Sequence, residues 1–316
     1  MKHLSARFKS KYLFQLISTC VLFFLVPCIL GLGIFMTRTY QHFVQTNRSY
    51  YEETTLAFGR HFDSMLSTMK KQASRLELES RLQSSELSLL GTLAAQTNNY
   101  YVRKALDHLT KYNSLNSYDL GLYYFDSQTA LYKSAKFTLA RLSRALGVRE
   151  ENAAAFEAFF APTGELGMRR FVQGDKLLIG FPARLGKGRR EVLALYELSS
   201  ASLDSRQFAS ATTFDSTFCV YDGSALLLAN RQEGLSTFDP SLSQASGSAE
   251  FREEGIRYLA FSKPSPTTAF TYACVLPFDH MTANTYHLFA TQQLTLILEV
   301  VLFVVLLVLF VHINYR

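Results

Sequence analysis

The stretch YLAFSKPSPTTAFTYACVLPFDHM, residues 258–281, contains two apolar and aromatic runs separated by a short polar connection. The first run belongs to IRYLAFSK (256–263), which begins two residues earlier, and the second is TAFTYACVL (268–276). Pro264-Ser265-Pro266 lies between them and marks a turn. The stretch therefore predicts two antiparallel strands joined by a turn.

Three more strands precede this pair and complete one predicted module, residues 205–288. Glycine-containing turn signals, Asp222-Gly223 and Glu254-Gly255, separate its neighbouring strands. A polar, serine-rich segment (231–248) separates the second strand from the third. The five predicted strands are TFCVY (217–221), ALLLAN (225–230), AEFRE (249–253), IRYLAFSK (256–263) and TAFTYACVL (268–276).

Residues 117–204 repeat the same order of elements without sequence identity between the halves, so only the architecture is repeated. Here a predicted helical stretch from Thr138 to Phe160 replaces the serine-rich segment. Gly174-Asp175 and Gly186-Lys187-Gly188 are the turn signals. The five predicted strands are SYDLGLYYF (117–125), ALYKS (130–134), MRRFV (168–172), KLLIGFPA (176–183) and REVLALYEL (190–198).

A helical stalk is predicted for residues 37–116, because apolar residues recur there at spacings of three and four. Two interpretations of this stripe stay open, packing on the chain's own domain or the seam of a homodimer that transmits a signal. The stripe comprises Phe58, Phe62, Met65, Met69, Ala73 and Leu76.

Two apolar runs, 13–36 and 289–312, are each long enough to cross a bilayer as a helix. Basic residues without acids in 1–12 predict a cytoplasmic N-terminus. The central domain is then extracellular, and 313–316 is a short cytoplasmic end at the cell membrane. A cleaved signal peptide is the alternative for the first run.

Glu299 is the single charged residue in the second apolar run. A carboxylate is costly at the centre of a bilayer, so Glu299 should face protein there. A contact between helices of a homodimer is one interpretation. A shallow position that reaches headgroup water is the other.

Catalytic and metal-binding patterns are missing from the sequence. There is no G-x-S-x-G, H-E-x-x-H or Walker motif, and the 7 histidines are scattered without metal-ligand spacing. The chain is therefore expected to be no enzyme and to hold no metal and no cofactor. The segment between the apolar runs is nearly neutral, so no direct contact with nucleic acid is expected.

This order of elements resembles the double Cache sensor domain of bacterial transmembrane receptors, over residues 13 to 316. The segment 258–281 resembles the end of the membrane-proximal module in AraC-type transmembrane regulators and YesM-like sensor kinases. The resemblance implies an α+β fold with two PAS-like antiparallel-sheet modules. Residues 117–204 are then the membrane-distal module and residues 205–288 the membrane-proximal one.

The resemblance also implies a ligand pocket between the sheet of the distal module and its insertion. An arginine there can receive a carboxylate, phosphate or sugar hydroxyl. The alternative is that these side chains are core residues or solvated strand ends. The chain has no tryptophan, so the family's amino-acid signature is incomplete and an amino-acid ligand is not implied. The candidate ligand-binding residues are Tyr123, Tyr124, Arg169, Arg170, Phe181 and Tyr196.

In PAS-like sheets the first and last strands of a module are neighbours. Cys219 and Cys274 lie on those two strands of the second module, so they are either bridged or free and packed as apolar residues.

These features predict a membrane-bound receptor module that binds an unidentified extracellular small molecule. The second apolar run would transmit the signal to a cytoplasmic output. An AraC-type region is the first choice for this output, and a histidine kinase is the second. A sequence that stops at Arg316 is then expected to be truncated or split before that output. A non-signalling, membrane-anchored binding or scaffold protein is the alternative.

Overall fold

The structure is a computed structural model. It describes residues 2–82, 119–133, 135–162, 167–187, 189–203, 216–241 and 247–278, with single residues between 90 and 107 and parts of 291–309. The chain divides into two compact units. One comprises residues 1–51 with 277–316, and the other comprises residues 52–276.

Helix α1 (Lys2–Ser80) is one continuous helix that includes Pro27. Most side chains of the predicted first span, 13–36, lie outside the described residues. Residues 279–290 and 310–316 lie wholly outside the described residues. In the described part of the chain, no helix combines the length and the apolar character that crossing a bilayer requires.

The first sheet has the order β3-β2-β1-β6-β5-β4, and every neighbouring pair is antiparallel. It confirms the five strands predicted in this half and adds β3 at the edge. Its strands are β1 (Asp119–Tyr124), β2 (Thr129–Tyr132), β3 (Ala135–Thr138), β4 (Arg169–Gln173), β5 (Lys176–Leu185) and β6 (Arg190–Ser199).

The second sheet has the order β8-β7-β11-β10-β9. When the edge strand β3 is set aside, the two sheets have the same topology, so the predicted repeat of architecture is confirmed. The strands are β7 (Thr217–Asp222), β8 (Ala225–Ala229), β9 (Ser248–Glu253), β10 (Ile256–Pro264) and β11 (Phe270–Pro277).

The predicted helical stretch from Thr138 to Phe160 is confirmed as helical, but the structure breaks it into three pieces. It consists of α3 (Leu139–Ala145), the 3₁₀ turn η3 (Glu150–Asn152) and α4 (Ala153–Phe160). Gly147 has φ +69°, a left-handed conformation that ends a helix and that glycine adopts without steric cost. A second 3₁₀ turn, η4 (Ser200–Leu203), follows β6.

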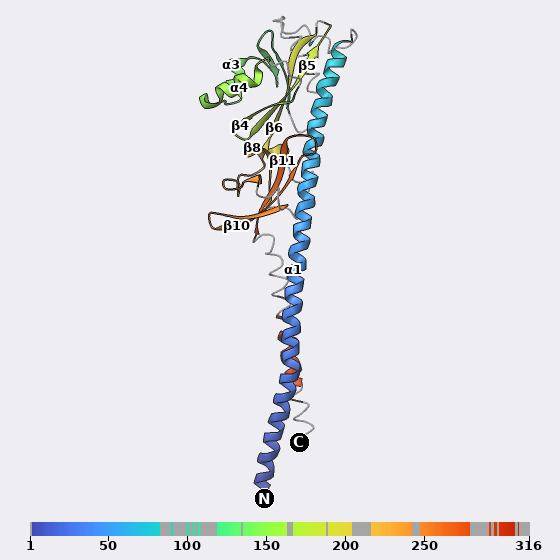
Figure 1. Ribbon diagram of the computed structural model, residues 1–316, viewed down its shortest axis with the longest axis vertical. Coiled ribbons are helices and arrows are strands. Elements are labelled where there is room, and N and C mark those ends of the chain that lie inside the picture. The colour runs from blue at the N-terminus through green and yellow to red at the C-terminus, as the bar shows by residue number, and fades with distance from the viewer. Residues whose placement is uncertain are drawn as a thin grey trace. The chain divides into compact units, whose positions relative to one another are not determined.

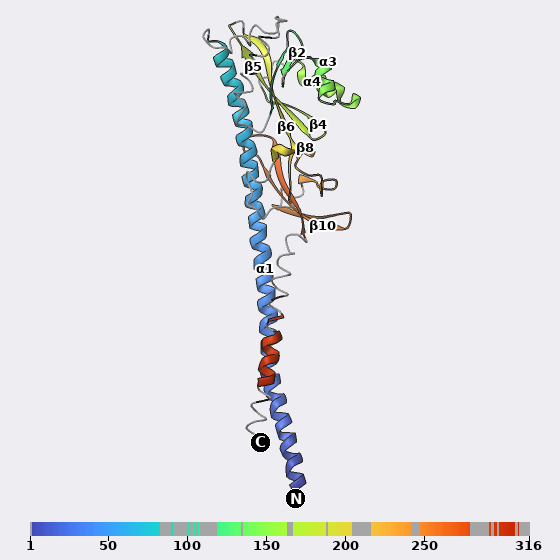
Figure 2. The same cartoon turned by 180° about the vertical axis from the view of Figure 1, so that it is seen from behind.

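Helix α1 and the pair α3 and α4 lie on opposite faces of the first sheet (Figures 1 and 2). Residues of α1 beyond Glu52 also run along the second sheet (Figure 1). Strand residues alternate between faces, so one set of strand side chains meets α1 and the other meets α3 and α4.

The apolar stripe of α1 packs on the sheets of its own unit. Phe58 lies 5.3 Å from Phe218 and 5.7 Å from Tyr272, measured between ring centroids. Phe58, Phe62 and Met69 are fully buried, whereas Met65 is only half-buried. The packing interpretation therefore describes where these side chains lie, and a role for them in a dimer stays a prediction.

Candidate functional site

The six predicted ligand-binding residues lie on two faces of the first sheet. Tyr123 and Leu193 are cross-strand partners, and both belong to the core beneath α3 and α4. Arg169 pairs with Gly180, which pairs with Leu195 of the same core, so Arg169 shares this face. The other four lie on the face that meets α1, namely Tyr124, Arg170, Phe181 and Tyr196.

Tyr123 and Arg169 meet around one partly exposed ring, that of Phe125. The ring centroids of Tyr123 and Phe125 are 5.5 Å apart, and the Arg169 guanidinium carbon lies 5.5 Å from the Phe125 centroid. Phe160 of α4 closes the group, with its ring centroid 4.5 Å from that of Tyr123. We call these four residues, Tyr123, Phe125, Phe160 and Arg169, the arginine cluster.

Arg169 is held by the carbonyl end of α4. Its Nη1 donates to the backbone oxygens of Phe159, at 2.9 Å, and of Ala161. The last carbonyls of a helix lack partners within the helix and carry partial negative charge, so they attract a guanidinium. This anchoring fixes a planar cation, a good group for carboxylate, phosphate or hydroxyl oxygens, beside aromatic rings.

Two tyrosines on the α1 face act as core contacts. The Tyr196 hydroxyl donates to the backbone oxygen of Met69 at 2.8 Å, and the Tyr124 hydroxyl donates to that of Leu90 at 2.8 Å. Burial raises the pKa of Tyr124 well above its ordinary value. Phe181 packs edge-on against Tyr196. For these three residues the core interpretation holds.

Arg170 joins the two sheets. It forms an ion pair with Asp222 at the end of β7, and its guanidinium carbon lies 5.7 Å from the ring centroid of Phe270. Although Arg169 and Arg170 are adjacent in sequence, the alternation of strand β4 sends them to different partners.

A charged group on the helix-covered face was not among the predicted site residues. Glu197 of β6 is only 7% exposed, and its Oε1 lies 3.2 Å from Lys176 Nζ and 3.6 Å from Lys133 Nζ. Asp119 lies 3.1 Å from Lys133 Nζ. Burial, with Asp119 nearby, raises the pKa of Glu197 to about 7.

The alternation of the strand does not identify this group. In REVLALYEL both Glu191 and Glu197 fall at the same alternate positions as Leu193 and Leu195, yet Glu191 is 60% exposed and Glu197 is buried.

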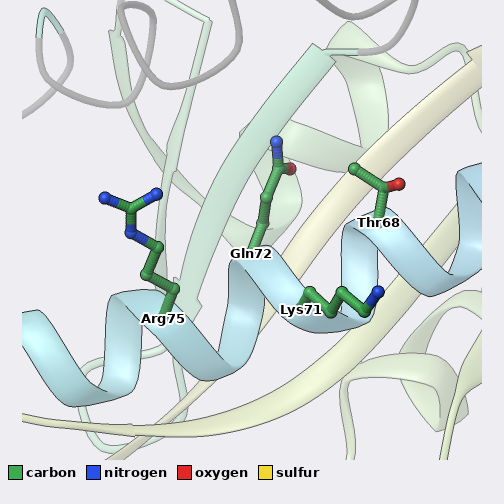
Figure 3. Close-up of a pocket in the computed structure, with 4 residues that line it drawn as sticks. All are labelled: Thr68, Lys71, Gln72 and Arg75. Carbon is green, nitrogen blue, oxygen red and sulfur yellow. The ribbon is translucent and has the colours of Figure 1, made fainter.

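A shallow pocket lies on α1 (Figure 3), lined by Thr68, Lys71, Gln72 and Arg75. These residues are three and four positions apart, so they share one face of the helix. Arg75 Nε donates to Glu79 at 2.6 Å. In the described part of the chain, no group of three or more His, Cys, Asp or Glu side chains could hold a metal.

Cys219 and Cys274 are free and buried, so the alternative of a disulfide is wrong. The predicted neighbouring strands are correct, since β7 pairs with β11, but Cys219 lies opposite Ala273 and Cys274 lies opposite Phe218. A shift of one residue points the two side chains to opposite faces of the sheet, so their sulfur atoms cannot meet.

Glu299 is exposed in the unit formed by residues 1–51 and 277–316. Its predicted contact between helices of a homodimer stays a prediction.

Known structures share this fold. The extracellular domain of the putative histidine kinase soHK1S-Z6 matches at a TM-score of 0.53 and 12% identity, over 78% of this chain and 99% of that one. The sensory domain of the Campylobacter jejuni chemoreceptor Tlp3 with isoleucine bound matches at 0.43 and 11%, over 77% and 97%. The sensor domain of the V. cholerae histidine kinase DctB matches at 0.45 and 12%, over 74% and 98%.

At these low identities the comparisons show only that the fold is shared. This statement rests on the soHK1S-Z6 domain, whose TM-score is 0.53. No protein-family model matches the sequence, and no curated protein matches it.

Proposed function

We propose that this chain is a Cache-type sensor module that binds a small molecule outside the cell at the arginine cluster. The observation that carries the proposal is the guanidinium of Arg169, fixed by two backbone carbonyls beside Phe125 and near Tyr123. Ligand sites commonly combine apolar and aromatic walls with a few placed polar groups. The fold supports the proposal, because an extracellular domain of a putative histidine kinase shares it.

We further propose that residues 13–36 and 289–312 cross the cell membrane, with both termini in the cytoplasm, and that the receptor is a homodimer. Exposed apolar side chains in the unit formed by 1–51 and 277–316 support the bilayer as a partner. Among them are Phe23, Leu30, Ile34, Leu298, Leu302 and Phe303. Apolar surface of this extent is typical of contact with lipid or another protein.

Helix α1 supports a signalling role, since one continuous helix contains the first apolar run and also contacts both sheets. A ligand that favours one arrangement of such a helix over another changes the population of the two. The output we propose is an AraC-type DNA-binding region, and the second candidate is a histidine kinase. The domain of soHK1S-Z6, which shares the fold, comes from a putative histidine kinase and so supports the second candidate. The AraC-type output rests on the sequence resemblance alone.

Thermal unfolding of the full chain in detergent micelles tests ligand binding. The probes are the proteinogenic amino acids, small dicarboxylates, sugar phosphates and free sugars. A ligand at a hundred times its Kd stabilises the folded state by about 2.7 kcal/mol, which raises the Tm measurably. Arg169→Ala is expected to abolish the shift given by the active probe.

Arg170→Ala is the matched control, because it removes the same charge one residue away on the opposite face of β4. The control should keep the shift seen with the unaltered chain. An undiminished shift in Arg169→Ala removes Arg169 from the site. The proposal of a sensor fails if none of the probes shifts the transition.

A further inference from the structure

Glu197 occupies an unusual place for a carboxylate. It lies on β6, the strand between β1 and β5, on the face that α3 and α4 cover. Its cross-strand partners are Asp119 on one side and Leu178 on the other. A carboxylate at such a site loses most of its hydration, so each of its oxygens needs a protein or ligand donor.

Only one of the two carboxylate oxygens has such donors. Lys176 and Lys133 both approach Oε1. Among the described residues, Oε2 is buried and has no hydrogen-bond partner. Leaving a buried acceptor unsatisfied is unfavourable, which points to a donor from outside the described residues.

A second unsatisfied group lies on the same face. The Tyr132 side chain is 3% exposed, and among the described residues its hydroxyl also has no hydrogen-bond partner. Tyr132 pairs with Gly121, which pairs with Leu195, two residues before Glu197. The Tyr132 ring lies against Gly121, since a Cβ there would come within 2.8 Å of it.

Strand β1 therefore lies between Tyr132 and Glu197 in the sheet. Along the strand direction the two residues are two positions apart. Strand spacings of about 4.8 Å and rises of about 3.3 Å put their Cα atoms about 12 Å apart. Both side chains project from the same face. One small molecule with several polar groups can therefore reach both of them.

The charges of the group decide the class of ligand. When Glu197 is ionised, Asp119 and Glu197 balance Lys133 and Lys176, so an ion of either sign then gains little from the group as a whole. Two hydroxyls of one molecule can donate to Oε2 of Glu197 and accept from the Tyr132 hydroxyl, and both orphan atoms are then satisfied. An ammonium group can only donate, so it can serve Oε2 but not the Tyr132 proton.

We propose that the first module binds a neutral polyhydroxylated molecule, a sugar or polyol, through Glu197 Oε2 and the Tyr132 hydroxyl. This inference rests on the proposed function of the module as a small-molecule sensor. It names the class of ligand, and it adds two binding residues on the face that holds the arginine cluster. A buried water that bridges the two groups is the alternative occupant.

Isothermal titration calorimetry on the full chain in detergent micelles tests the inference. The probes are D-glucose, D-ribose, myo-inositol and erythritol, with L-alanine and succinate as charged comparators. At least one polyol is expected to bind. Glu197→Gln should weaken that binding about tenfold or more, because it removes a charged acceptor. Tyr132→Phe should weaken it severalfold without changing the shape of the side chain.

Glu191→Gln is the matched control, since Glu191 lies on the same strand, is 60% exposed and pairs with Arg184. The Glu191→Gln variant should bind the polyol as tightly as the unaltered chain does. Each variant is first checked for a cooperative unfolding transition. If Glu197→Gln does not fold, the result with Tyr132→Phe decides.

The inference is overturned if no polyol binds, as expected when a water alone occupies the site. It is also overturned if a polyol binds equally well to both variants. Binding of succinate or an amino acid that depends on Arg169 but not on Glu197 leaves the proposed function intact and rejects the sugar site. If no probe of either experiment binds, both proposals fail together.

Discussion

The Tyr272 hydroxyl donates a hydrogen bond to the carboxylate of Asp63, 209 residues earlier in the chain. Ser265 Oγ donates to the same carboxylate, at 2.9 and 3.0 Å from its two oxygens. That serine also accepts from the backbone N–H groups of Thr267 and Thr268. The turn between β10 and β11 is thus ordered internally and fastened to α1 by one aspartate.

The first prediction concerns this contact. Asp63→Ala should lower the free energy of unfolding by about 2 kcal/mol, because it removes the charged acceptor that both the Tyr272 hydroxyl and Ser265 Oγ use. Chemical denaturation of the purified chain measures the loss. Combining it with Tyr272→Phe should give clearly less than the sum of the two losses, since both remove the same bond. The exposed neighbour Ser64→Ala should stay within about 0.5 kcal/mol of the unaltered chain.

The second prediction separates packing from dimerisation for the α1 stripe. Phe58→Ala should cost about 3–5 kcal/mol of stability, because Phe58 is fully buried against Phe218 and Tyr272. Leu56→Ala, at a position 39% exposed on the same helix, should cost less than about 1 kcal/mol. Denaturation measures both values. A change of oligomeric state in Phe58→Ala without loss of stability, seen by light scattering, would contradict the packing assignment.

The third prediction concerns the thiols of the second sheet. Burial raises the pKa of Cys274 to about 12 and raises that of Cys219 as well, so both stay protonated and unreactive in the folded chain. Iodoacetamide at pH 8 should leave both unmodified in the native state and modify both in denaturant without reductant. Mass spectrometry of the peptides reads the result, and a linked Cys219–Cys274 peptide is the contrary finding.

The fourth prediction is a pH dependence of stability that Glu197 causes. Burial, with Asp119 nearby, raises its pKa from 4.5 to about 7, so the folded state binds more protons than the unfolded state between these values. Stability should therefore fall as pH rises from about 4.5 through about 7. The expected loss is on the order of 1–2 kcal/mol, because the ion pairs with Lys133 and Lys176 offset part of the burial.

Denaturation at pH 5 and pH 8 measures this loss. Glu197→Gln, which does not titrate, should show a smaller difference between the two pH values, and the control Glu191→Gln should keep the full difference. An equal difference in all three chains would assign the dependence to other groups.

Local pattern was sufficient for the predicted strands and turns of both sheets, but not for the edge strand β3. Alternating apolar residues and glycine-containing turns act over a few residues, so TFCVY and IRYLAFSK could be placed without knowing their neighbours. The stripe that begins at Phe58 also followed from spacing alone. The break between α3 and α4 did not, because it depends on the single left-handed residue Gly147.

The candidate site was only partly predictable. Tyr123 and Arg169 were predicted only as candidates on two strands of one module, and they lie on one face of the sheet. Tyr124, Phe181 and Tyr196 were predicted with them but lie on the other face, which packs toward α1. Which face of a strand meets a helix depends on how distant segments dock, and no spacing within one strand contains that information.

The sequence by itself determined two modules of the same strand order and a long helix with one apolar stripe, because these follow from periodicity within short windows. Only the tertiary structure decided that this stripe is covered by the chain's own sheets. It also separated Cys219 from Cys274 by a shift of one residue in register. Finally, it placed Tyr132 and Glu197 on one buried face, each with a polar atom that has no partner in the described part of the chain, because burial and pairing are set by segments far apart in the chain.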